Sequence, residues 1–377
     1  MRICRIAVAP LTRIFERFPQ RDAHLLSRLE GFGHEVREVR ISPAWRPMMP
    51  PLAYLVGLLR AIPRVSLVNA DIILADGLEA GVVGWIAARV KRVPFVFDYR
   101  DHYSFLYRQE HGSRHPVAVQ VLEQWLPRVA DLVITADGRQ KKASLAAGAA
   151  PDRVRIIPNG VDLNRFTPGP KDPTLLAEWS LADRPVILYV GKVTPAFNLP
   201  MVVEAMREVV QQYPEASLLI VGDGTALPHL KRLSREMGLG THVVFAGCRP
   251  YSEIPAFIRS SDVCIYPLRS VAALSILEYM ACGKPVVVPN ADYDLSLPDG
   301  CCLPVEKSPE GFTEGITRLL GDPGLASNLG RKAREIVESQ FNWDHLALAY
   351  ESALRECVKR YSGAGPKRSG SRGGHGV

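Results

Sequence analysis

The sequence predicts an α/β protein made of two Rossmann-like, doubly wound domains that face an interdomain crevice. Three observations lead to this prediction. The chain has 377 residues, which is long for one hydrophobic core and suits two domains of ordinary size. Short apolar segments alternate with helical segments in both halves, as in parallel sheets with crossover helices. A stretch rich in proline, glycine and asparagine separates the halves.

In the first half, most predicted strands are short apolar runs without polar alternation, which is typical of a parallel sheet covered on both faces. They span residues 3–9, 35–39, 71–75, 95–98, 132–135 and 154–157. The predicted helices between them include 20–32, 79–90 and 117–129.

The second half repeats this pattern. Its predicted strands span residues 186–190, 217–221, 243–246, 263–266, 285–288 and 300–304. The predicted helices include 201–213, 226–237, 252–260 and 275–282. In open sheets of this kind, ligands bind beyond the carboxyl ends of the strands, so we expect the functional motifs there.

The boundary between the halves is marked by a turn-rich stretch, IPNGVDLNRFTPGPKDP, and we predict a linker near residues 158–184. We predict an N-terminal domain over residues 1–168, a C-terminal domain over 169–344 and a last helix, 345–361, that packs back. The final residues, 362–377, are rich in glycine, serine and basic residues and are predicted to be disordered.

The composition excludes several classes of protein. With 47% hydrophobic and 23% charged residues, the chain is typical of a soluble globular protein. Its seven cysteines include no CxxC pair, which argues against a zinc site or a disulfide framework and favours a reducing cytosol. No uncharged apolar run approaches the ~20 residues of a membrane span. We expect a cytoplasmic protein, either freely soluble or peripheral on the inner face of the membrane.

The charge is unevenly distributed. Residues 1–168 contain 24 basic and 16 acidic residues, whereas residues 169–361 contain 19 basic and 23 acidic residues. The basic first half indicates an anionic partner, such as a membrane surface or a lipid phosphate, or else only a solvated basic face. A nucleic-acid partner is disfavoured, because stacking aromatics do not interleave with the basic residues.

One apolar segment, SVAALSILEYMACGKPVV at residues 270–287, contains a single acid, Glu278. Residues 275–282 are predicted to be helical, with Gly283 as the residue that ends the helix. The amino end of this helix would face the crevice, where backbone N–H groups attract phosphate. Glu278 could then accept hydrogen bonds from ribose hydroxyls, or could be a solvent-facing helix acid.

Five stretches occur in the order RVRIIPNGVDLNRF, ILYVGKVTPAFNLPMVVEAM, LLIVGDGTALPHLKRL, VVFAGCRPYSEIPAFIRSSDVCIYPL and ILEYMACGKPVVVPN. Together they resemble retaining glycosyltransferases of family 4 (glycosyl transferases group 1), closely over residues 130–355 and more loosely over 1–130. The resemblance implies the GT-B architecture, with an acceptor-binding N-terminal domain and a nucleotide-sugar-binding C-terminal domain. It also implies transfer of a hexosyl-type sugar from a nucleotide sugar with retained anomeric configuration, without a cofactor or a required metal.

The resemblance assigns donor-binding roles to this chain's residues. Glu278 matches the second glutamate of the family's E-x7-E motif, which binds the ribose. The first glutamate, which contacts the transferred sugar in the family, is replaced by Ser270. This departure leaves open which sugar is transferred and whether the chain is fully active. Ala273 and Leu274, just before the predicted helix, and Ser275, its first residue, are expected to lie next to the donor.

Other donor contacts follow from the remaining motifs. Gly191 and Lys192 match a glycine-basic pair after the first strand of the second half. Lys192 would bind the leaving diphosphate and act as a catalytic residue by stabilising its charge. The family's second basic residue is replaced by Phe197. Gly222 belongs to a Gly-Asp-Gly turn near the nucleotide, or serves the turn alone. Arg249 falls where the family contacts the base.

The acceptor site is expected in the first half. Arg13, Arg17 and Arg21 follow its first strand, in reach of an anionic acceptor or the donor phosphates, unless they are only solvated. The segment FVFDYRDHYSF, residues 95–105, resembles a version found in one branch of the family. From it we predict Arg100 in the acceptor site, and Asp101 and His102 as catalytic residues that bind sugar hydroxyls or move a proton.

The expected partners are a nucleotide-sugar donor and a glycan or lipid-linked acceptor, such as a cell-envelope precursor. The segment PLAYLVGLLRAI, residues 51–62, could contact a membrane surface or lie in the core. The alternative function is a catalytically degraded relative that acts as a binding or scaffold protein.

Overall fold

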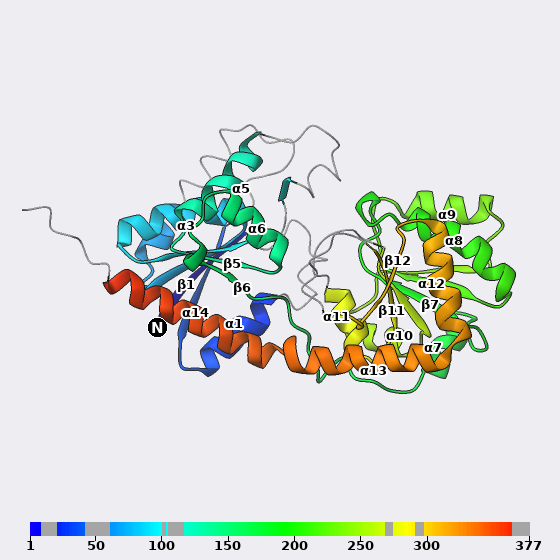
Figure 1. The fold of residues 1–377 in the computed structure, drawn as a ribbon. Helices are drawn as coiled ribbons and strands as arrows, with labels where there is room; N and C mark the ends of the chain where they lie inside the picture. Colours follow the sequence, from blue (N-terminus) through cyan, green and yellow to red (C-terminus); the bar gives the residue numbers. More distant parts are fainter. Residues whose placement is uncertain are drawn as a thin grey trace, which may run out of the picture.

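The computed structural model describes residues 1–8, 21–41, 61–99, 103–104, 117–267, 274–290 and 298–363. These residues form two α/β units, each built on a six-stranded sheet (Figure 1). The strands pair in parallel in both sheets. The predicted fold class, two Rossmann-like domains, is therefore confirmed.

The N-terminal sheet has the strand order β2-β1-β3-β4-β5-β6. Its strands are β1 (Arg2–Val8), β2 (Glu35–Ile41), β3 (Ile72–Asp76), β4 (Phe95–Tyr99), β5 (Leu132–Thr135) and β6 (Val154–Ile156). The helices around it are α1 (Arg21–Gly31), α3 (Gly77–Lys91), α5 (Val117–Val129), α6 (Gly138–Ala146) and the 3-10 turn η2 (Pro151–Arg153).

The C-terminal sheet has the strand order β12-β11-β10-β7-β8-β9. Its strands are β7 (Val186–Val190), β8 (Ser217–Val221), β9 (Val243–Gly247), β10 (Val263–Ile265), β11 (Val286–Pro289) and β12 (Leu303–Val305). Its helices are α7 (Pro173–Glu178), η3 (Pro195–Phe197), α8 (Leu199–Gln212), α9 (Leu227–Glu236), α10 (Ile254–Arg259), α11 (Leu274–Ala281), α12 (Pro309–Gly321) and α13 (Pro323–Gln340). The chain winds outward from β7 and then returns to β10, so the strand order reverses between these two strands.

Apolar residues cover both faces of each sheet. Strands β7 and β8, with the sequences VILYV and SLLIV, are buried at every position. In β7, Val186, Leu188 and Val190 belong to one core cluster, and Ile187 and Tyr189 to another, as expected when side chains alternate between faces. Continuous apolar strands of this kind need helices on both sides, which the α/β architecture supplies.

The last helix, α14 (Trp343–Gly363), leaves the C-terminal unit and packs on the N-terminal one. Figure 1 shows α13 and α14 in sequence along one side of both units. Tyr350 and Leu354 of α14 lie in the same buried cluster as Ile3 and Leu29. The Arg28 guanidinium and the Asp344 carboxylate, 2.6 Å apart, add an ion pair at this contact.

Two helices lie where the residue pattern carries no clear helical signal. Helix α7 falls in the stretch expected to be a linker, where Asp172 caps it by accepting hydrogen bonds from the Thr174 and Leu175 amides. Helix α6 starts at Gly138, where the Asp137 side chain accepts from the Gln140 amide. Both are short helices whose start depends on an aspartate cap. Within the described residues, no helix combines the length and apolar character needed to cross a bilayer.

Candidate functional site

The carboxyl edge of the C-terminal sheet, where β7 and β10 lie side by side, is the position at which open α/β sheets bind ligands. Strand β7 is followed by Gly191 and Lys192, and β10 leads by way of Tyr266 toward α11. The amino end of α11 therefore lies at the same edge as the turn after β7.

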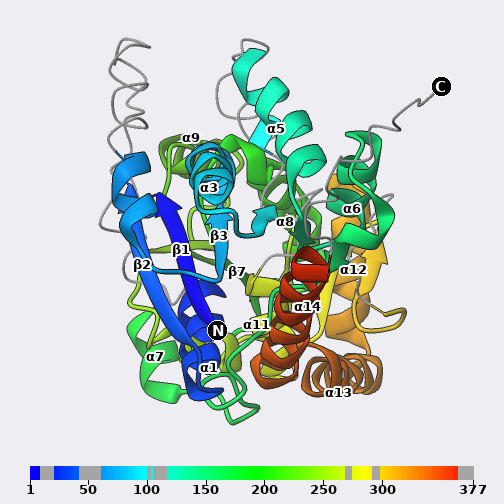
Figure 2. The ribbon, with the colours of Figure 1, turned by 90° about the vertical axis from the view of Figure 1, so that its left-hand side faces the viewer.

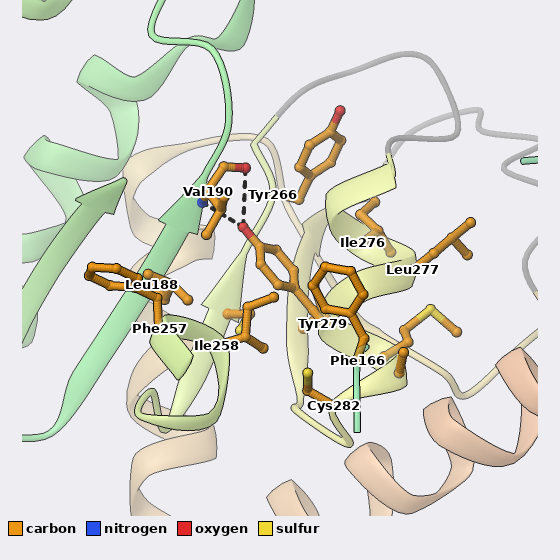
Figure 3. Close-up of a cluster of buried hydrophobic side chains, with 14 of the residues drawn as sticks. Phe166, Leu188, Val190, Phe257, Ile258, Tyr266, Ile276, Leu277, Tyr279 and Cys282 are labelled. Carbon is orange, nitrogen blue, oxygen red and sulfur yellow. Dashed lines mark hydrogen bonds between the residues drawn. The ribbon is translucent and has the colours of Figure 1, made fainter. Parts of the chain in front are cut away.

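Helix α11 is fastened to the end of β7 by Tyr279. The Val190 amide donates a hydrogen bond to the Tyr279 hydroxyl over 2.6 Å, and the hydroxyl faces the Val190 carbonyl at 3.4 Å (Figure 3). Figure 3 shows the Tyr279 ring among Ile276, Phe166 and Ile258. This buried contact fixes the distance between α11 and the turn after β7.

The turns after β7 and β8 pack directly on each other. The Gly191 amide donates to the Val221 carbonyl over 3.0 Å, and the Val193 amide donates to the Asp223 carbonyl over 2.9 Å. Gly222 has a φ of +150°, and a Cβ atom there would lie 1.8 Å from the Gly191 carbonyl oxygen. The close approach of the two turns thus requires glycine at this position.

Lys192 lies at the end of β7 with its side chain exposed. The Tyr189 hydroxyl donates to the Lys192 carbonyl over 2.7 Å, which fixes the backbone of the turn. Phe197, at the position of the family's second basic residue, is half-buried and packs edge-on against Tyr189 with ring centroids 6.3 Å apart. The described part of this edge therefore offers one lysine where the resemblance implies two cations.

Glu278 is a buried acid: its exposed fraction is 5%. The Tyr251 hydroxyl donates a hydrogen bond to Glu278 Oε1 over 2.7 Å. Burial raises the pKa of Glu278 to about 7, against the opposing effects of this hydrogen bond and of the Arg165 charge. A buried carboxylate with a raised pKa, at the edge where open α/β sheets bind ligands, is typical of a functional group, because a purely structural acid is usually exposed or ion-paired.

Ser275 and Leu274 occupy the first turn of α11 and are both half-buried. Their place next to the amino end of the helix is compatible with the predicted contact to a donor phosphate.

Arg249 makes contacts that its sequence position did not indicate. Its guanidinium lies over the Trp179 ring, 4.9 Å from the centroid, and 5.9 Å from that of Phe257. It also pairs with Glu178 at 3.2 Å. These contacts connect the loop after β9 to the end of α7, and a base contact by Arg249 stays a prediction.

The N-terminal sheet holds a buried charged cluster of Arg5, Arg21, Asp22, Asp76 and Asp98. Arg5 pairs with Asp22 and donates to Asp76 over 2.8 Å. Arg21 lies 3.7 Å from Asp98 and donates to the Pro158 carbonyl over 2.6 Å. Burial raises the pKa of both Asp76 and Asp98, whose residues are paired in register on β3 and β4.

Several predicted site residues lie outside the described residues. They are Ser270 and Ala273 in the donor site, and Arg13, Arg17, Arg100, Asp101 and His102 in the first domain. Within the part of the chain that the structure describes, no group of three or more His, Cys, Asp and Glu residues could hold a metal ion.

Sequence reasoning missed the partners of Glu278. Tyr251 precedes it by 27 residues and Arg165 lies in the stretch between the sheets, so no local spacing connects them. The charged cluster had one available signal: Arg5 interrupts the apolar strand ICRIAV.

Comparison with known protein families gives two matches. The family profile "Glycosyl transferases group 1" matches residues 175–336, and "Glycosyl transferase 4-like domain" matches residues 9–160. The first match covers most of the C-terminal unit, and the second covers most strands of the N-terminal sheet.

Two curated relatives illustrate the sequence similarity. The chain is 30% identical over 224 residues to a GDP-mannose-dependent alpha-(1-6)-phosphatidylinositol monomannoside mannosyltransferase of Mycolicibacterium smegmatis, covering 56% of this chain and 59% of that protein. It is 26% identical over 323 residues to a D-inositol 3-phosphate glycosyltransferase of Corynebacterium jeikeium, covering 81% and 77%. The first alignment therefore spans less than two thirds of that relative's length.

Two solved structures illustrate the similarity in fold. Anabaena HepE, in complex with UDP and glucose, gives a TM-score of 0.76 at 19% identity, over 94% of this chain and 100% of that chain. Sucrose-phosphate synthase from Thermosynechococcus elongatus gives 0.74 at 21% identity, over 95% and 99%. At these identities the likeness establishes the GT-B arrangement of two Rossmann-like domains.

Proposed function

Because the chain belongs to the group 1 glycosyltransferases, we propose that it transfers a hexosyl-type sugar from a nucleotide-sugar donor to an acceptor hydroxyl with retention of anomeric configuration. The observation that carries this proposal is Glu278. It is a buried carboxylate at the carboxyl edge of the C-terminal sheet, held by Tyr251 and placed one turn inside α11. A carboxylate in that place can accept hydrogen bonds from the two hydroxyls of a ribose.

The donor diphosphate would lie between the amino end of α11 and the turn after β7. Backbone amides at a helix amino end attract phosphate, and Lys192 would add a positive charge. As the bond between the sugar and the diphosphate breaks, these groups stabilise the negative charge that develops on the leaving group. The acceptor would attack on the face that the diphosphate leaves, and no metal or cofactor is needed for these steps.

The first domain would bind the acceptor through Arg13, Arg17 and Arg100, with Asp101 and His102 orienting the attacking hydroxyl. The surplus of eight basic residues over residues 1–168 supports an anionic acceptor. Two relatives are named for acceptors that contain phosphate and inositol, which supports a lipid-linked or phosphorylated polyol acceptor.

The test is calorimetric titration with UDP and GDP, since relatives and fold neighbours are named with both nucleotides. The Glu278→Gln variant should bind the preferred nucleotide about 10- to 150-fold more weakly, the effect of losing hydrogen bonds to a charged group worth ~1.5–3 kcal/mol. The matched control is Glu236→Gln, which changes an exposed glutamate on α9 of the same unit. Binding that Glu278→Gln leaves unchanged would rule out the assigned donor site.

Turnover then tests catalysis. UDP-glucose and GDP-mannose would be offered with phosphoinositol acceptors, and the anomeric configuration of the product read by NMR. A second candidate, a binding protein without catalysis, is favoured by the half-buried Phe197 in place of a second cation. Tight nucleotide binding without transfer from any nucleotide sugar would support that candidate.

A further inference from the structure

The Glu278 carboxylate has one hydrogen-bond donor among the residues that the structure describes. That donor is the Tyr251 hydroxyl, 2.7 Å from Oε1. No other described residue donates to Glu278, so Oε2 has no protein donor within that part of the chain. A carboxylate held at one oxygen keeps the second oxygen available for a ligand hydroxyl.

Tyr251 is itself held by the connecting segment, residues 157–185, which lies between the last strand of the N-terminal sheet and the first strand of the C-terminal sheet. The Phe166 ring packs edge-on against the Tyr251 ring, with centroids 5.5 Å apart. The Arg165 guanidinium lies over the same ring, 5.3 Å from its centroid. Phe166 is fully buried, so the edge-on contact cannot shift without disturbing the core.

Arg165 is placed by the turn before it. Asp162 Oδ1 accepts hydrogen bonds from the Asn164 amide over 3.0 Å and from the Arg165 amide over 3.2 Å. This side chain–backbone turn sets the direction of the chain at Arg165, within the connecting segment. A continuous set of contacts therefore runs from Asp162 through Arg165 to Tyr251 and Glu278.

We propose that Tyr251 is a positioning residue for the donor ribose, holding the Glu278 carboxylate toward the ribose hydroxyls while Arg165 and Phe166 hold the Tyr251 ring. This inference rests on the proposed donor site. It gives the connecting segment between the domains a direct effect on nucleotide binding.

The hydroxyl of Tyr251 is suited to this role because it stays protonated. Burial and the neighbouring Glu278 carboxylate raise the pKa of Tyr251 well above its ordinary value, so it remains a donor at any working pH. Oε1 has two lone pairs and can accept from Tyr251 and from one ribose hydroxyl together, while Oε2 accepts from the other hydroxyl. Loss of the tyrosine hydroxyl would leave the buried carboxylate free to rotate and less well ionised.

The charged and titratable groups around Glu278 come from three elements. Arg165 lies on the connecting segment, Tyr251 precedes α10, and Tyr279 and Cys282 are on or next to α11 itself. Of these, Tyr251 is the group that contacts the carboxylate through a hydrogen bond, and Arg165 acts through its charge.

The experiment compares two ligands on each variant: the preferred nucleoside diphosphate, UDP or GDP, and its 2′,3′-dideoxy analogue. Tyr251→Phe should weaken binding of the ribose form about 5- to 15-fold, less than Glu278→Gln does, because the carboxylate stays in place and only the one hydrogen bond that orients it is lost. It should leave binding of the dideoxy form unchanged, because that ligand has no 2′- or 3′-hydroxyl to donate a hydrogen bond to Glu278. In Tyr251→Phe/Glu278→Gln, the loss should not exceed that of Glu278→Gln alone.

The matched control is Tyr213→Phe, which removes a tyrosine hydroxyl that donates to the Thr317 carbonyl in the same unit. It should leave both ligands unaffected. Arg165→Gln should weaken the ribose form about 2- to 5-fold through loss of the cation–π contact.

Equal weakening of both ligands by Tyr251→Phe would overturn the inference, since it would show a general structural role. A loss in Glu278→Gln with none in Tyr251→Phe would overturn it while the proposed function stands. Failure of the wild-type protein to bind either nucleotide would overturn both together.

Discussion

At the scale of single residues, Glu278 combines a buried carboxylate with a place where a ligand is expected. Burial raises its pKa to about 7, so near neutral pH the group is half protonated. Protonation turns one carboxylate oxygen into a hydrogen-bond donor, so the acid can accept fewer hydrogen bonds from the ribose hydroxyls. Ligand binding should therefore draw on the ionised form and should respond to pH in the physiological range.

We expect nucleotide affinity to be full at pH 8 and to fall about tenfold per pH unit below pH 7, because each unit costs ~1.4 kcal/mol to ionise the acid. The measurement is the dissociation constant at pH 8, 7, 6 and 5. The ligand's own phosphate titrates with a pKa near 6, and Glu278→Gln retains that contribution. The ratio of wild-type to variant affinity isolates the effect of Glu278, and a ratio independent of pH would contradict the prediction.

Gly222 is a second residue whose identity is fixed by its surroundings, in this case by the backbone of the neighbouring turn. A Cβ atom at its φ of +150° would lie 1.8 Å from the Gly191 carbonyl oxygen, which is backbone and cannot move away as a flexible side chain could. Gly222→Ala should lower the free energy of unfolding by more than about 3 kcal/mol, measured by urea denaturation.

The matched variant is Gly247→Ala, at the end of β9. Gly247 has a φ of +70°, and a Cβ atom there would meet nothing within 4 Å. Only the left-handed backbone conformation is therefore penalised, at about 1–2 kcal/mol. Equal losses in the two variants would show that the contact between the turns after β7 and β8 carries no special constraint.

At the scale of elements, α14 offers two leucines in opposite environments. Leu354 is fully buried against the N-terminal unit, whereas Leu348 is 52% exposed. Leu354→Ala should lower the free energy of unfolding by about 2–5 kcal/mol, as for other buried leucines. Leu348→Ala should change it by less than about 0.5 kcal/mol. Thermal or urea unfolding measures both, and a comparable loss at Leu348 would contradict the burial of α14 on this face.

The elements themselves were the part of the structure best predicted from sequence. The strands predicted at residues 132–135, 186–190 and 217–221 coincide with β5, β7 and β8. These are short, almost entirely apolar runs, so one local signal decides their existence and, to within a residue, their limits. Helix α7 was harder to predict because its six residues follow several prolines, and its stability comes from Leu176 in the core and from the Asp172 cap.

The candidate site was predictable only where a local motif marks it. Around Glu278, neighbouring residues alone predicted the helix, its end at Gly283 and the lone acid. The contacts of Glu278 with Tyr251 and of Tyr251 with Arg165 depend on how three segments distant in sequence pack together. Neither the hydrophobic periodicity nor the spacing of residues in the sequence predicts that packing. The stacking of Arg249 on Trp179 depends in the same way on a helix, α7, that the sequence pattern did not reveal.

At the scale of the whole molecule, the chain passes between the two units twice. The first passage is near Gly160 and the second is near Asn342, and they lie side by side. The Val161 amide donates to the Phe341 carbonyl over 2.9 Å, and Gly160 lies against the Trp343 ring. In Figure 2, where the N-terminal unit faces the viewer, α14 lies in front, to the right of β1 and β3. The N-terminal unit thus takes its last helix from the far end of the chain.

This arrangement predicts which fragments fold. Both core clusters of the C-terminal unit consist of residues from Val161 to Phe341, so a fragment of residues 161–341 should unfold cooperatively in urea and still bind the preferred nucleotide. A fragment of residues 1–160 lacks Trp343, Tyr350 and Leu354, which complete one of its two clusters, and should show no cooperative transition. Joining residues 342–363 to residue 160 through a short glycine-serine linker should restore that transition, because the two chain passages already lie side by side. A cooperative transition in residues 1–160 alone would show that α14 is dispensable for the first domain, and the helix would then serve only to hold the two units together.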